Sequence, residues 1–484
     1  MRTDPTRLGL RFSSPLVGAL ALAVALATVG PASAEPPGPG PRGLEIDRVW
    51  SGHPVGFDWL LHGDLLIVAY YDSDRALTVA SRRIAPDPES TDSEPGAGWT
   101  KVRLPQKVGW DSHNGIAMVR DAEGLIHLAA NMHVAPLVYF RTDRPDDVTS
   151  FVAINRMTGD RETRCTYPRF FQGPNRELLF SHRDGASGAG DLLMNVYDPT
   201  NRSWRRLIDG PLLDGDGERN AYPFGPSPGP DGRFHIGWVW RDTPDCATNH
   251  DLGYARSRDL VHWENAAGDP LTLPIHLDSP ATVDPVPVRG GLLNLNNSIA
   301  FDSRNRPILA YHKYDAEGNL QAYAARFENG RWKVRQASSW DSRWDFSGGG
   351  SIQVDVTLGR LAPDGPGRFA LPYTHWIEGE GRIPLDEETL TPIAADAPRP
   401  ASDAQPRKRE RSPTASSRSA LLQRLRRPEG ADPGLTVHLM TRPGPAGSLL
   451  ALRWETLGPN RDHPRPGTPP APSPLRLHVV PASR

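Results

Sequence analysis

Cysteine is scarce in this 484-residue sequence, which has only Cys165 and Cys246. Two cysteines exclude a disulfide-dense scaffold and any zinc module built on four cysteines. Excess charge of either sign is also missing, because 55 Lys and Arg face 57 Asp and Glu, a formal net charge of −2 at pH 7. Balanced charge gives no general attraction to nucleic acid or to an anionic membrane. We therefore expect no nucleic-acid partner.

Long apolar runs are missing except near the N-terminus, at residues 15–29. A charged stretch precedes this run, and Ala32-Ser-Ala34 follows it, which is the pattern of a secretory signal peptide. We predict that residues 1–34 are removed near Ala34 and that the mature protein is secreted or periplasmic. No later run is long enough to span a bilayer, so we expect no stable membrane insertion. Residues 35–42 form a Pro/Gly-rich lead-in.

Glycine and proline are abundant, at 46 and 50 residues, which favours many short elements joined by turns. Four segments look alike: each is a turn followed by an alternating apolar strand, then a second strand with an aromatic residue. They begin at Asp121, Asn175, Asp231 and Asp302, which lie 54, 56 and 71 residues apart. A mean spacing of about 60 residues is typical of one four-stranded propeller blade with its loops. Ser257-Arg-Asp-Leu-Val-His-Trp263 also has the S-x-D-x-x-x-W shape of a β-hairpin Asp-box.

The spacing predicts an all-β fold, a β-propeller with seven blades. Its strands should occupy residues 43–393 and finish in residues 433–484, beside the N-terminal strands. Residues 394–432 have nine basic and five acidic residues and no strand alternation, which predicts a disordered basic insertion. A pair of β-sandwiches is the alternative fold.

Polar side chains gather at the ends of successive predicted strands. These stretches are Trp110–Gly115, Asn131–His133, Cys165–Arg169 and Ser181–Gly185. At the mouth of a propeller channel they would bring together two His, one Tyr and one Arg. Arginine grips a carboxylate bidentately and stabilises charge that develops beside it. Histidine serves as a base near neutral pH, and tyrosine can return a proton to a departing oxygen. This set suits β-elimination from a uronic acid.

Other catalytic signatures are missing. The sequence has no G-x-S-x-G elbow and no H-E-x-x-H helix motif. The polar cluster has no obvious pair of carboxylates, which argues against an ordinary two-carboxylate glycosidase.

The motifs Trp110-Asp-Ser-His-Asn, Asn131-Met-His, Tyr167-Pro-Arg-Phe and Ser181-His-Arg-Asp-Gly together resemble the BNR-4 repeat family of secreted propellers. That family includes ulvan lyases and related lyases that cut rhamnose–glucuronate linkages. The resemblance implies that His113 is the general base and Tyr167 the general acid. It further implies that His133 and Arg183 hold and neutralise the uronate carboxylate. Which of His113 and Tyr167 takes the C5 proton depends on the stereochemistry of the sugar.

Weaker candidates accompany this set. Asn114 and Asn131 would position sugar hydroxyls, and His250 would line the channel and contact substrate. Three tryptophans are candidates for stacking on sugar rings if they are exposed: Trp340, Trp344 and Trp376.

The two cysteines leave three alternatives. Cys165 and Cys246 could form one disulfide in an oxidising compartment. Cys246 and His250 could instead belong to a structural zinc site with further ligands. Two buried free thiols are the third alternative. We expect no catalytic cofactor, and a structural calcium or zinc ion stays open.

Three functions compete at this stage. The first is a secreted polysaccharide lyase that cleaves a glucuronate–rhamnose type linkage by β-elimination. The second is a sialidase-like glycoside hydrolase on the same propeller. The third is a non-catalytic carbohydrate-binding propeller. In all three the partner is a polysaccharide, and for the lyase it contains uronic acid.

Overall fold

Aspartates at the predicted repeat starts hold the turns between consecutive strands. Asp121 follows β6 (Ile116–Arg120) and precedes β7 (Ile126–Ala130). Its Oδ1 accepts hydrogen bonds from the backbone N–H of Glu123 and Leu125, at 3.0 and 2.8 Å. Asp302 Oδ1 accepts the corresponding pair from Arg304 and Arg306. A side chain that satisfies two turn amides fixes the turn, and the strand after it begins in register.

The computed structural model describes residues 43–84, 98–393, 417–427 and 434–481. The predicted signal peptide, the lead-in and most of the predicted insertion lie outside these residues. Within them, no helix has the length and apolar character needed to cross a membrane.

The described strands form six hydrogen-bonded sheets. The first contains β1 (Leu44–Val49), β30 (Ser473–Val480), β29 (Leu449–Leu457) and β28 (Leu435–Pro443). The second contains β2 (Asp58–His62), β3 (Leu65–Tyr71), β4 (Ala76–Arg83) and β5 (Thr100–Lys107). The third adds β9 (Tyr139–Thr142) and β10 (Phe151–Ala153) to β6 and β7.

The fourth sheet has ten strands. Its members are β8 (His133–Ala135), β11 (Cys165–Gln172), β12 (Leu178–Ala186), β13 (Ala189–Asp198), β14 (Ser203–Arg206), β15 (Asn220–Pro228), β16 (Phe234–Arg241), β17 (Asn249–Ser257), β18 (Trp263–Glu264) and β19 (Thr282–Asp284). The fifth contains β20 (Ser298–Phe301), β21 (Pro307–Tyr314), β22 (Leu320–Glu328) and β23 (Arg331–Gln336). The sixth contains β24 (Val356–Leu358), β25 (Ala362–Pro363), β26 (Arg368–His375) and β27 (Gly379–Asp386).

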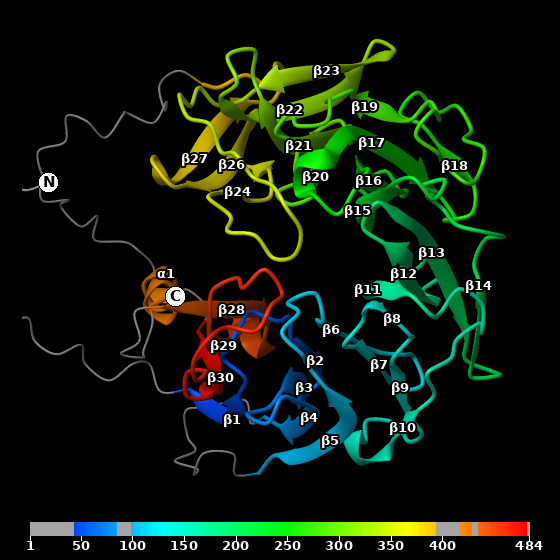
Figure 1. The fold of residues 1–484 in the computed structure, drawn as a ribbon, viewed down its shortest axis with the longest axis vertical. Coiled ribbons are helices and arrows are strands. Elements are labelled where there is room, and N and C mark those ends of the chain that lie inside the picture. The colour runs from blue at the N-terminus through cyan, green and yellow to red at the C-terminus, as the bar shows by residue number, and fades with distance from the viewer. Residues whose placement is uncertain (1–42, 85–97, 394–416, 428–433, 482–484) are drawn as a thin grey trace, which may run out of the picture. The chain divides into compact units, whose positions relative to one another are not determined.

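The fold is an all-β propeller, as predicted, and its sheets follow one another in chain order (Figure 1). The ten-stranded sheet contains two antiparallel groups, β11–β14 and β15–β18, which one parallel bridge joins at Gly190 and Asn220. The number of blades depends on how this sheet is divided, so the count of seven stays a prediction. The first sheet joins the two ends of the described chain, because Leu44 of β1 pairs with Leu477 of β30.

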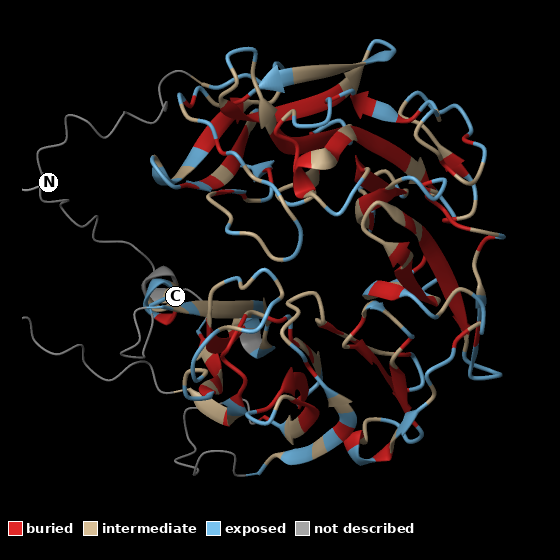
Figure 2. Ribbon diagram, in the orientation of Figure 1, coloured by how far each residue is buried: buried red, intermediate tan, exposed pale blue. Residues whose placement is uncertain are grey.

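The core lies within and between the sheets, where most strand residues are buried (Figure 2). The Asp-box shows why its tryptophan is part of that core. Asp259 Oδ1 accepts from the backbone N–H of Val261 and His262, and the Nε1 of Trp263 donates to the carbonyl of Leu260. Two tryptophans that the sequence offered as sugar platforms, Trp340 and Trp344, are also buried, so that expectation is wrong for both.

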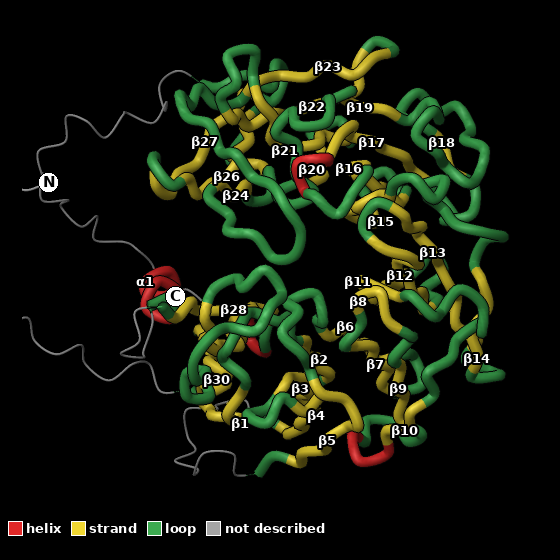
Figure 3. Tube along the Cα trace, viewed as in Figure 1, coloured by secondary structure: helices red, strands yellow, loops and turns green. Residues whose placement is uncertain are grey.

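Of the predicted disordered insertion, residues 394–432, the structure describes residues 417–427, and for this part the prediction is wrong. Ser417–Leu425 forms the helix α1, which Figure 3 shows beside the C-terminal strands. Leu425 is 1% exposed and packs with Ala451 and Val480, and its carbonyl accepts a hydrogen bond from Arg453 Nε at 2.9 Å. The basic composition of the segment led us to predict disorder, although its leucine Leu425 packs in the core.

Candidate functional site

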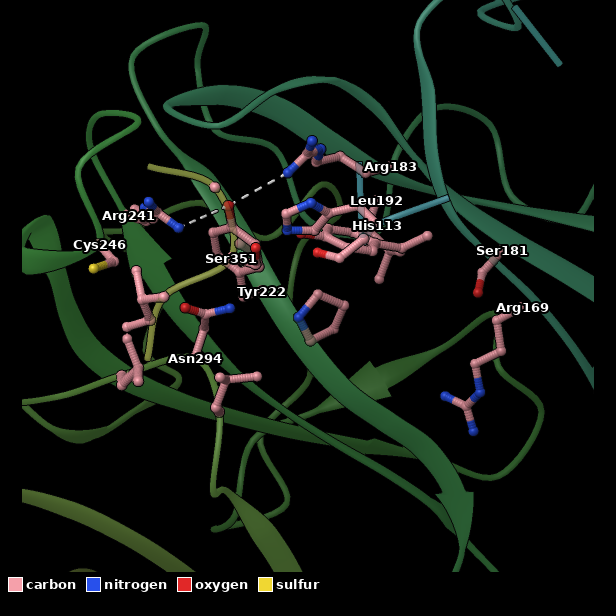
Figure 4. A pocket seen from close by; sticks show the side chains of 18 of the residues that line it. His113, Arg169, Ser181, Arg183, Leu192, Tyr222, Arg241, Cys246, Asn294 and Ser351 are labelled. Atoms are coloured by element: carbon pink, nitrogen blue, oxygen red, sulfur yellow. Dashed lines mark hydrogen bonds between the residues drawn. The ribbon is translucent and has the colours of Figure 1, made fainter. Parts of the chain in front are cut away.

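A cavity of about 480 Å³ lies where the strands β11 and β15 begin. Its wall comes from β11, β12, β13, β15 and β16, from the segment between β16 and β17, and from the loops that precede β6, β20 and β24. Figure 4 shows side chains from these separate elements pointing into one space. Among the described residues that line it, none is Asp or Glu.

His113 lies in the loop before β6 and is oriented by two carboxylates. Its Nδ1 is 2.8 Å from Asp111 Oδ1 and 3.1 Å from Asp462 Oδ2. Asp462 comes from the loop between β29 and β30 and also accepts from the backbone N–H of Ser112. With Nδ1 engaged, Nε2 is the ring nitrogen that His113 can present to a ligand in the cavity.

His133 begins β8 and shares Asp111 with His113. Its Nδ1 lies 2.5 Å from Asp111 Oδ2, and the two imidazole rings stack with centroids 4.3 Å apart. Of the two histidines, only His113 lines the cavity. His133 packs against the imidazole of His113 outside the cavity wall. One carboxylate thus fixes the orientation of both rings.

The carboxylates favour the charged form of His113. Burial of the ring opposes the charge, but the hydrogen bonds to Asp111 and Asp462 outweigh it and raise the pKa of His113 to about 9. Burial also opposes ionisation of Asp462, yet its contact with His113 lowers its pKa to about 2. For Asp111, hydrogen bonds from His113 and His133 overcome burial and hold its pKa well below the usual range. At neutral pH the group is an imidazolium between two carboxylates.

Tyr167 stands in a strained position in β11. Its φ is +57°, and the pairing of β11 with β12 shifts register between Thr166 and Arg169. A bulky residue with positive φ is an outlier, and such strain gathers at functional sites. The side chain is 37% exposed, and its ring centroid lies 6.0 Å from that of His113. The backbone therefore holds a phenol in the cavity near the imidazole.

A second tyrosine, Tyr222 of β15, faces two arginines. Its hydroxyl accepts from Arg241 Nη1 at 3.1 Å and from Arg183 Nη1 at 3.5 Å, and it also bonds Ser187. Burial would raise the pKa of Tyr222, but the positive charges of Arg241 and Arg183 lower it. The rings of Tyr222 and Tyr167 lie 6.0 Å apart, so the two phenols adjoin in the wall.

Three arginines of the wall have no acidic partner in the part of the chain that the structure describes. Arg183 and Arg241 are 3% and 7% exposed, and within the described chain both donate to hydroxyls and carbonyls but form no ion pair. Arg169 donates to the carbonyls of Gly225 and Pro226, and Figure 4 shows it apart from the other two. Buried charges are normally paired, so this wall suits an anionic ligand.

Two predicted substrate-binding residues, Asn131 and Asn114, do not belong to the cavity wall. The side-chain amide of Asn131 donates to Gln106 Oε1 at 3.0 Å and to the carbonyl of Lys107 at 3.1 Å, both in β5. The backbone carbonyl of Asn114 accepts from the hydroxyl of Tyr71 at 2.7 Å.

His250 also lies outside the wall. Its Nδ1 contacts Asp251 at 2.7 Å and its Nε2 contacts Asp242 at 2.9 Å, so both ring nitrogens are occupied. Cys165 and Cys246 are free and buried, which rules out the disulfide alternative. Cys246 lines the cavity, whereas Cys165 is in the core.

Two groups of residues in the described chain have the spacing of metal ligands. They are Asp111, His113 and His133, and Asp214, Asp216 and His276. Neither group contains Cys246 or His250.

Sequence reasoning missed Tyr222, although a signal was present. Cys165-Thr-Tyr167-Pro begins β11 and Asn220-Ala-Tyr222-Pro begins β15, which are the first strands of the two antiparallel groups of the ten-stranded sheet. Arg183 and Arg241 likewise pair with the first residues of those strands or next to them, Arg183 with Thr166 and Arg241 with Asn220. Asp462 ends the motif Glu455-Thr-Leu-Gly-Pro-Asn-Arg-Asp462, which is also part of the family resemblance, but no repeat spacing connects it with His113, because its loop reaches the site only through the fold.

The family follows from a sequence match that includes His113, Tyr167 and Arg183 of this site. The model of the BNR repeat-containing family matches residues 67–340, more than half of the chain. The chain belongs to the BNR repeat-containing family. This confirms the family resemblance drawn from the motifs.

Among curated proteins, this BNR-repeat protein is similar to the short isoform of ulvan lyase from Alteromonas sp. (strain LOR). The two are 28% identical over 137 residues, which is 25% of this chain and 25% of that protein. The match thus spans about a quarter of the relative's length.

Two solved polysaccharide lyases share the fold. A PL25 ulvan lyase bound to -[GlcA(1-4)Rha3S]- has a TM-score of 0.52 at 14% identity, covering 72% of this chain and 85% of that one. The polysaccharide lyase Uly1 has a TM-score of 0.55 at 13% identity, covering 91% and 99%.

Proposed function

We propose that this protein is a polysaccharide lyase that cleaves a uronate-containing polymer, of glucuronate–rhamnose type, by β-elimination. One observation carries the proposal: the same cavity holds an oriented imidazole, a phenol and two buried guanidinium groups that have no acidic partner among the described residues. His113, Tyr167 and Arg183 are the groups that elimination beside a carboxylate requires. The names of the similar lyases support the polymer class.

Arg183 binds the uronate carboxylate in the first step. The positive charges of Arg183 and of Arg241, which lies behind Tyr222, neutralise the carboxylate. This makes the proton on C5 more acidic. His133 and Asp111 keep His113 in place while the sugar binds.

Proton transfer then opens the linkage. In its neutral form, His113 takes the C5 proton through Nε2. The electron pair left on C5 forms the C4–C5 double bond as the C4–O bond breaks. The departing oxygen takes a proton from the hydroxyl of Tyr167. The products are an unsaturated uronate and a new reducing end, and no water is consumed.

A sialidase-like hydrolase is less well supported. Hydrolysis by two carboxylates needs an acid and a base or nucleophile facing the sugar. The nearest carboxylates, Asp111 and Asp462, are both engaged by His113, and the described wall has no other. The arginines also do not converge, since Arg169 lies apart from Arg183 and Arg241 (Figure 4).

The proposal includes the site of action. We propose that the protein works outside the cytoplasm after cleavage near Ala34, where polymeric substrates are met. The mass of the protein recovered from the medium or periplasm of an expressing bacterium tests this, and retention of residues 1–34 contradicts it.

The activity test incubates the mature protein with ulvan, gum arabic and a sialoglycan and follows ultraviolet absorbance and reducing ends together. Elimination raises both signals on a uronate polymer. His113→Ala should abolish the rise, while His262→Ala, which removes an exposed histidine of the Asp-box, should leave it unchanged. New reducing ends without absorbance would overturn the proposal in favour of hydrolysis.

A further inference from the structure

Trp376 is an exposed tryptophan in the turn between β26 and β27. Its side chain is 43% exposed and that of its neighbour Ile377 is 57% exposed, whereas Trp340 and Trp344 are buried. An exposed apolar pair of this size beside a cavity commonly marks a binding surface. The question is therefore what this pair binds.

The exposed ring is held in a rigid stack. The indole of Trp376 lies on the imidazole of His375, with centroids 4.2 Å apart and planes at 19°. His375 in turn packs on the buried ring of Trp340 at 4.8 Å. One face of the Trp376 indole is thus covered, and the exposed area belongs to the rest of the ring.

Hydrogen bonds fix His375 and the turn that carries Trp376. The Nδ1 of His375 accepts from the backbone N–H of Ile377 at 3.1 Å and of Glu378 at 3.2 Å. Its Nε2 bonds Ser342 Oγ at 3.1 Å. The ring is therefore preorganised, so a ligand that stacks on it pays little ordering entropy.

The stack lies at the same end of its sheet as the cavity. His375 pairs with Val356, the first residue of β24, and the backbone N–H of Trp376 donates to the carbonyl of Asp355 at 3.0 Å. Ile352, three residues before Asp355, lines the cavity. Three residues span at most about 10 Å, so Trp376 is within reach of a chain that leaves the cavity.

We propose that Trp376 is a platform for a neutral sugar ring of the polysaccharide, some residues away from the bond that is cut. This assignment rests on the proposed function, because it places the platform along the same polymer. A pyranose presents an apolar face of C–H groups that packs flat on an indole. Glu378 follows Trp376 in the same turn and Glu380 lies just beyond it in β27, and their charge disfavours an anionic sugar there, whether a uronate or a sulfated sugar such as Rha3S. A deoxy sugar that carries no sulfate is neutral and fits this surface.

The kinetic test compares long and short substrates. Trp376→Ala should raise KM for desulfated ulvan, whose rhamnose is neutral, about tenfold with kcat unchanged, since buried apolar area is lost without touching the reacting groups. The same variant should cut the shortest cleavable oligosaccharide as wild type does. Trp376→Phe, which keeps a flat ring, should restore most of the affinity. Val152→Ala, an exposed apolar residue of β10, is the matched control and should change nothing.

Affinity electrophoresis in gels that contain desulfated ulvan separates this proposal from the lyase proposal, because it needs no turnover. Retardation of wild type that weakens in Trp376→Ala supports the platform even if no double bond is ever formed. Equal retardation and equal KM for the two proteins overturn the platform and leave the lyase proposal intact. Lack of wild-type retardation, or a change in self-association instead, also overturns it. Thermal unfolding checks that each variant is folded.

Discussion

Asp462 Oδ2 lies 3.1 Å from Nδ1 of His113, so the loop between the last two strands completes the environment of a histidine near the start of the fold. The same aspartate accepts from the backbone N–H of Ser112 and of Ser351, which draws three loops together over the cavity. The charge of His113 therefore depends on closure of the propeller.

The first prediction concerns the pH dependence of activity. The base form of His113 is neutral, so kcat/KM should rise with pH until about 9, where His113 loses its proton. Asp462→Asn removes one of the charges that stabilise the imidazolium and should move this limb about one unit toward lower pH. The pH profile of kcat/KM on ulvan measures both. Asp364→Asn, in an exposed turn, should leave the limb in place. An unchanged limb in Asp462→Asn, or activity that falls as pH rises to 9, contradicts the role of His113.

The second prediction separates the two tyrosines. Tyr167→Phe removes the proton donor and should lower kcat by about 10²–10⁴-fold. Tyr222→Phe removes the hydroxyl between Arg183 and Arg241 and should cost about tenfold, because the arginines lose alignment but the donor remains. Steady-state kinetics on one substrate give both values. The reverse order would assign the proton transfer to Tyr222.

The third prediction uses two buried arginines in similar surroundings. Arg183 and Arg141 each donate to a tyrosine hydroxyl, Tyr222 and Tyr197 respectively. Arg183→Ala should lower kcat/KM by about 10²–10³-fold, because the carboxylate loses its partner. Arg141→Ala, outside the cavity, should destabilise the fold but leave the kcat/KM of the folded fraction near wild type. Equal losses of activity would mean that Arg183 acts through stability alone.

Much of the site was predictable because its motifs sit at equivalent strand ends. His113, Tyr167 and Arg183 were found in this way, and the structure brings all three to one cavity. The same reasoning also singled out Asn131 and His250, which do not line the cavity, since a strand-end position does not say which way a side chain turns. Asn131 is held by the last residue of β5 in the preceding sheet, and His250 by the residue next to it in sequence.

The features that the sequence did not predict depend on contacts between distant segments or on single buried side chains. The contribution of Asp462 depends on loops distant in sequence, for which the pattern of repeats gives no information. The helix α1 was missed because its composition is basic, while a single buried leucine, Leu425, decides its packing. Repeat spacing did predict the strands β12, β16 and β21, since each follows its turn aspartate or asparagine.

The fourth prediction concerns stability in acid. Burial lowers the pKa of His53 and His312 from 6.5 to about 4, and both side chains are fully buried. In the unfolded state both histidines bind a proton below pH 6.5, whereas in the folded state they stay neutral down to about pH 4. The free energy of unfolding is therefore unaffected by them above pH 6.5 and falls as pH falls from 6.5 toward 4. Each can account for a loss of about 3 kcal/mol at most. His113 acts in the opposite direction, because its raised pKa favours the folded state below 6.5.

Urea unfolding at pH 7.5 and at pH 5 measures this effect. The free energy of unfolding should be clearly lower at pH 5, and His62→Gln, at an exposed histidine, should not alter the difference. Equal stability at the two pH values would show that the buried histidines do not titrate on unfolding.

The mass of the cleavage product tests the central claim most directly. A uronate–rhamnose oligosaccharide is cut to completion by the wild-type protein, and the fragments are weighed. Elimination predicts a fragment with an unsaturated uronate at its new non-reducing end, which is one water lighter than the corresponding hydrolysis fragment and absorbs in the ultraviolet, and His113→Ala should form none. Fragments that carry the full mass of added water would contradict the account.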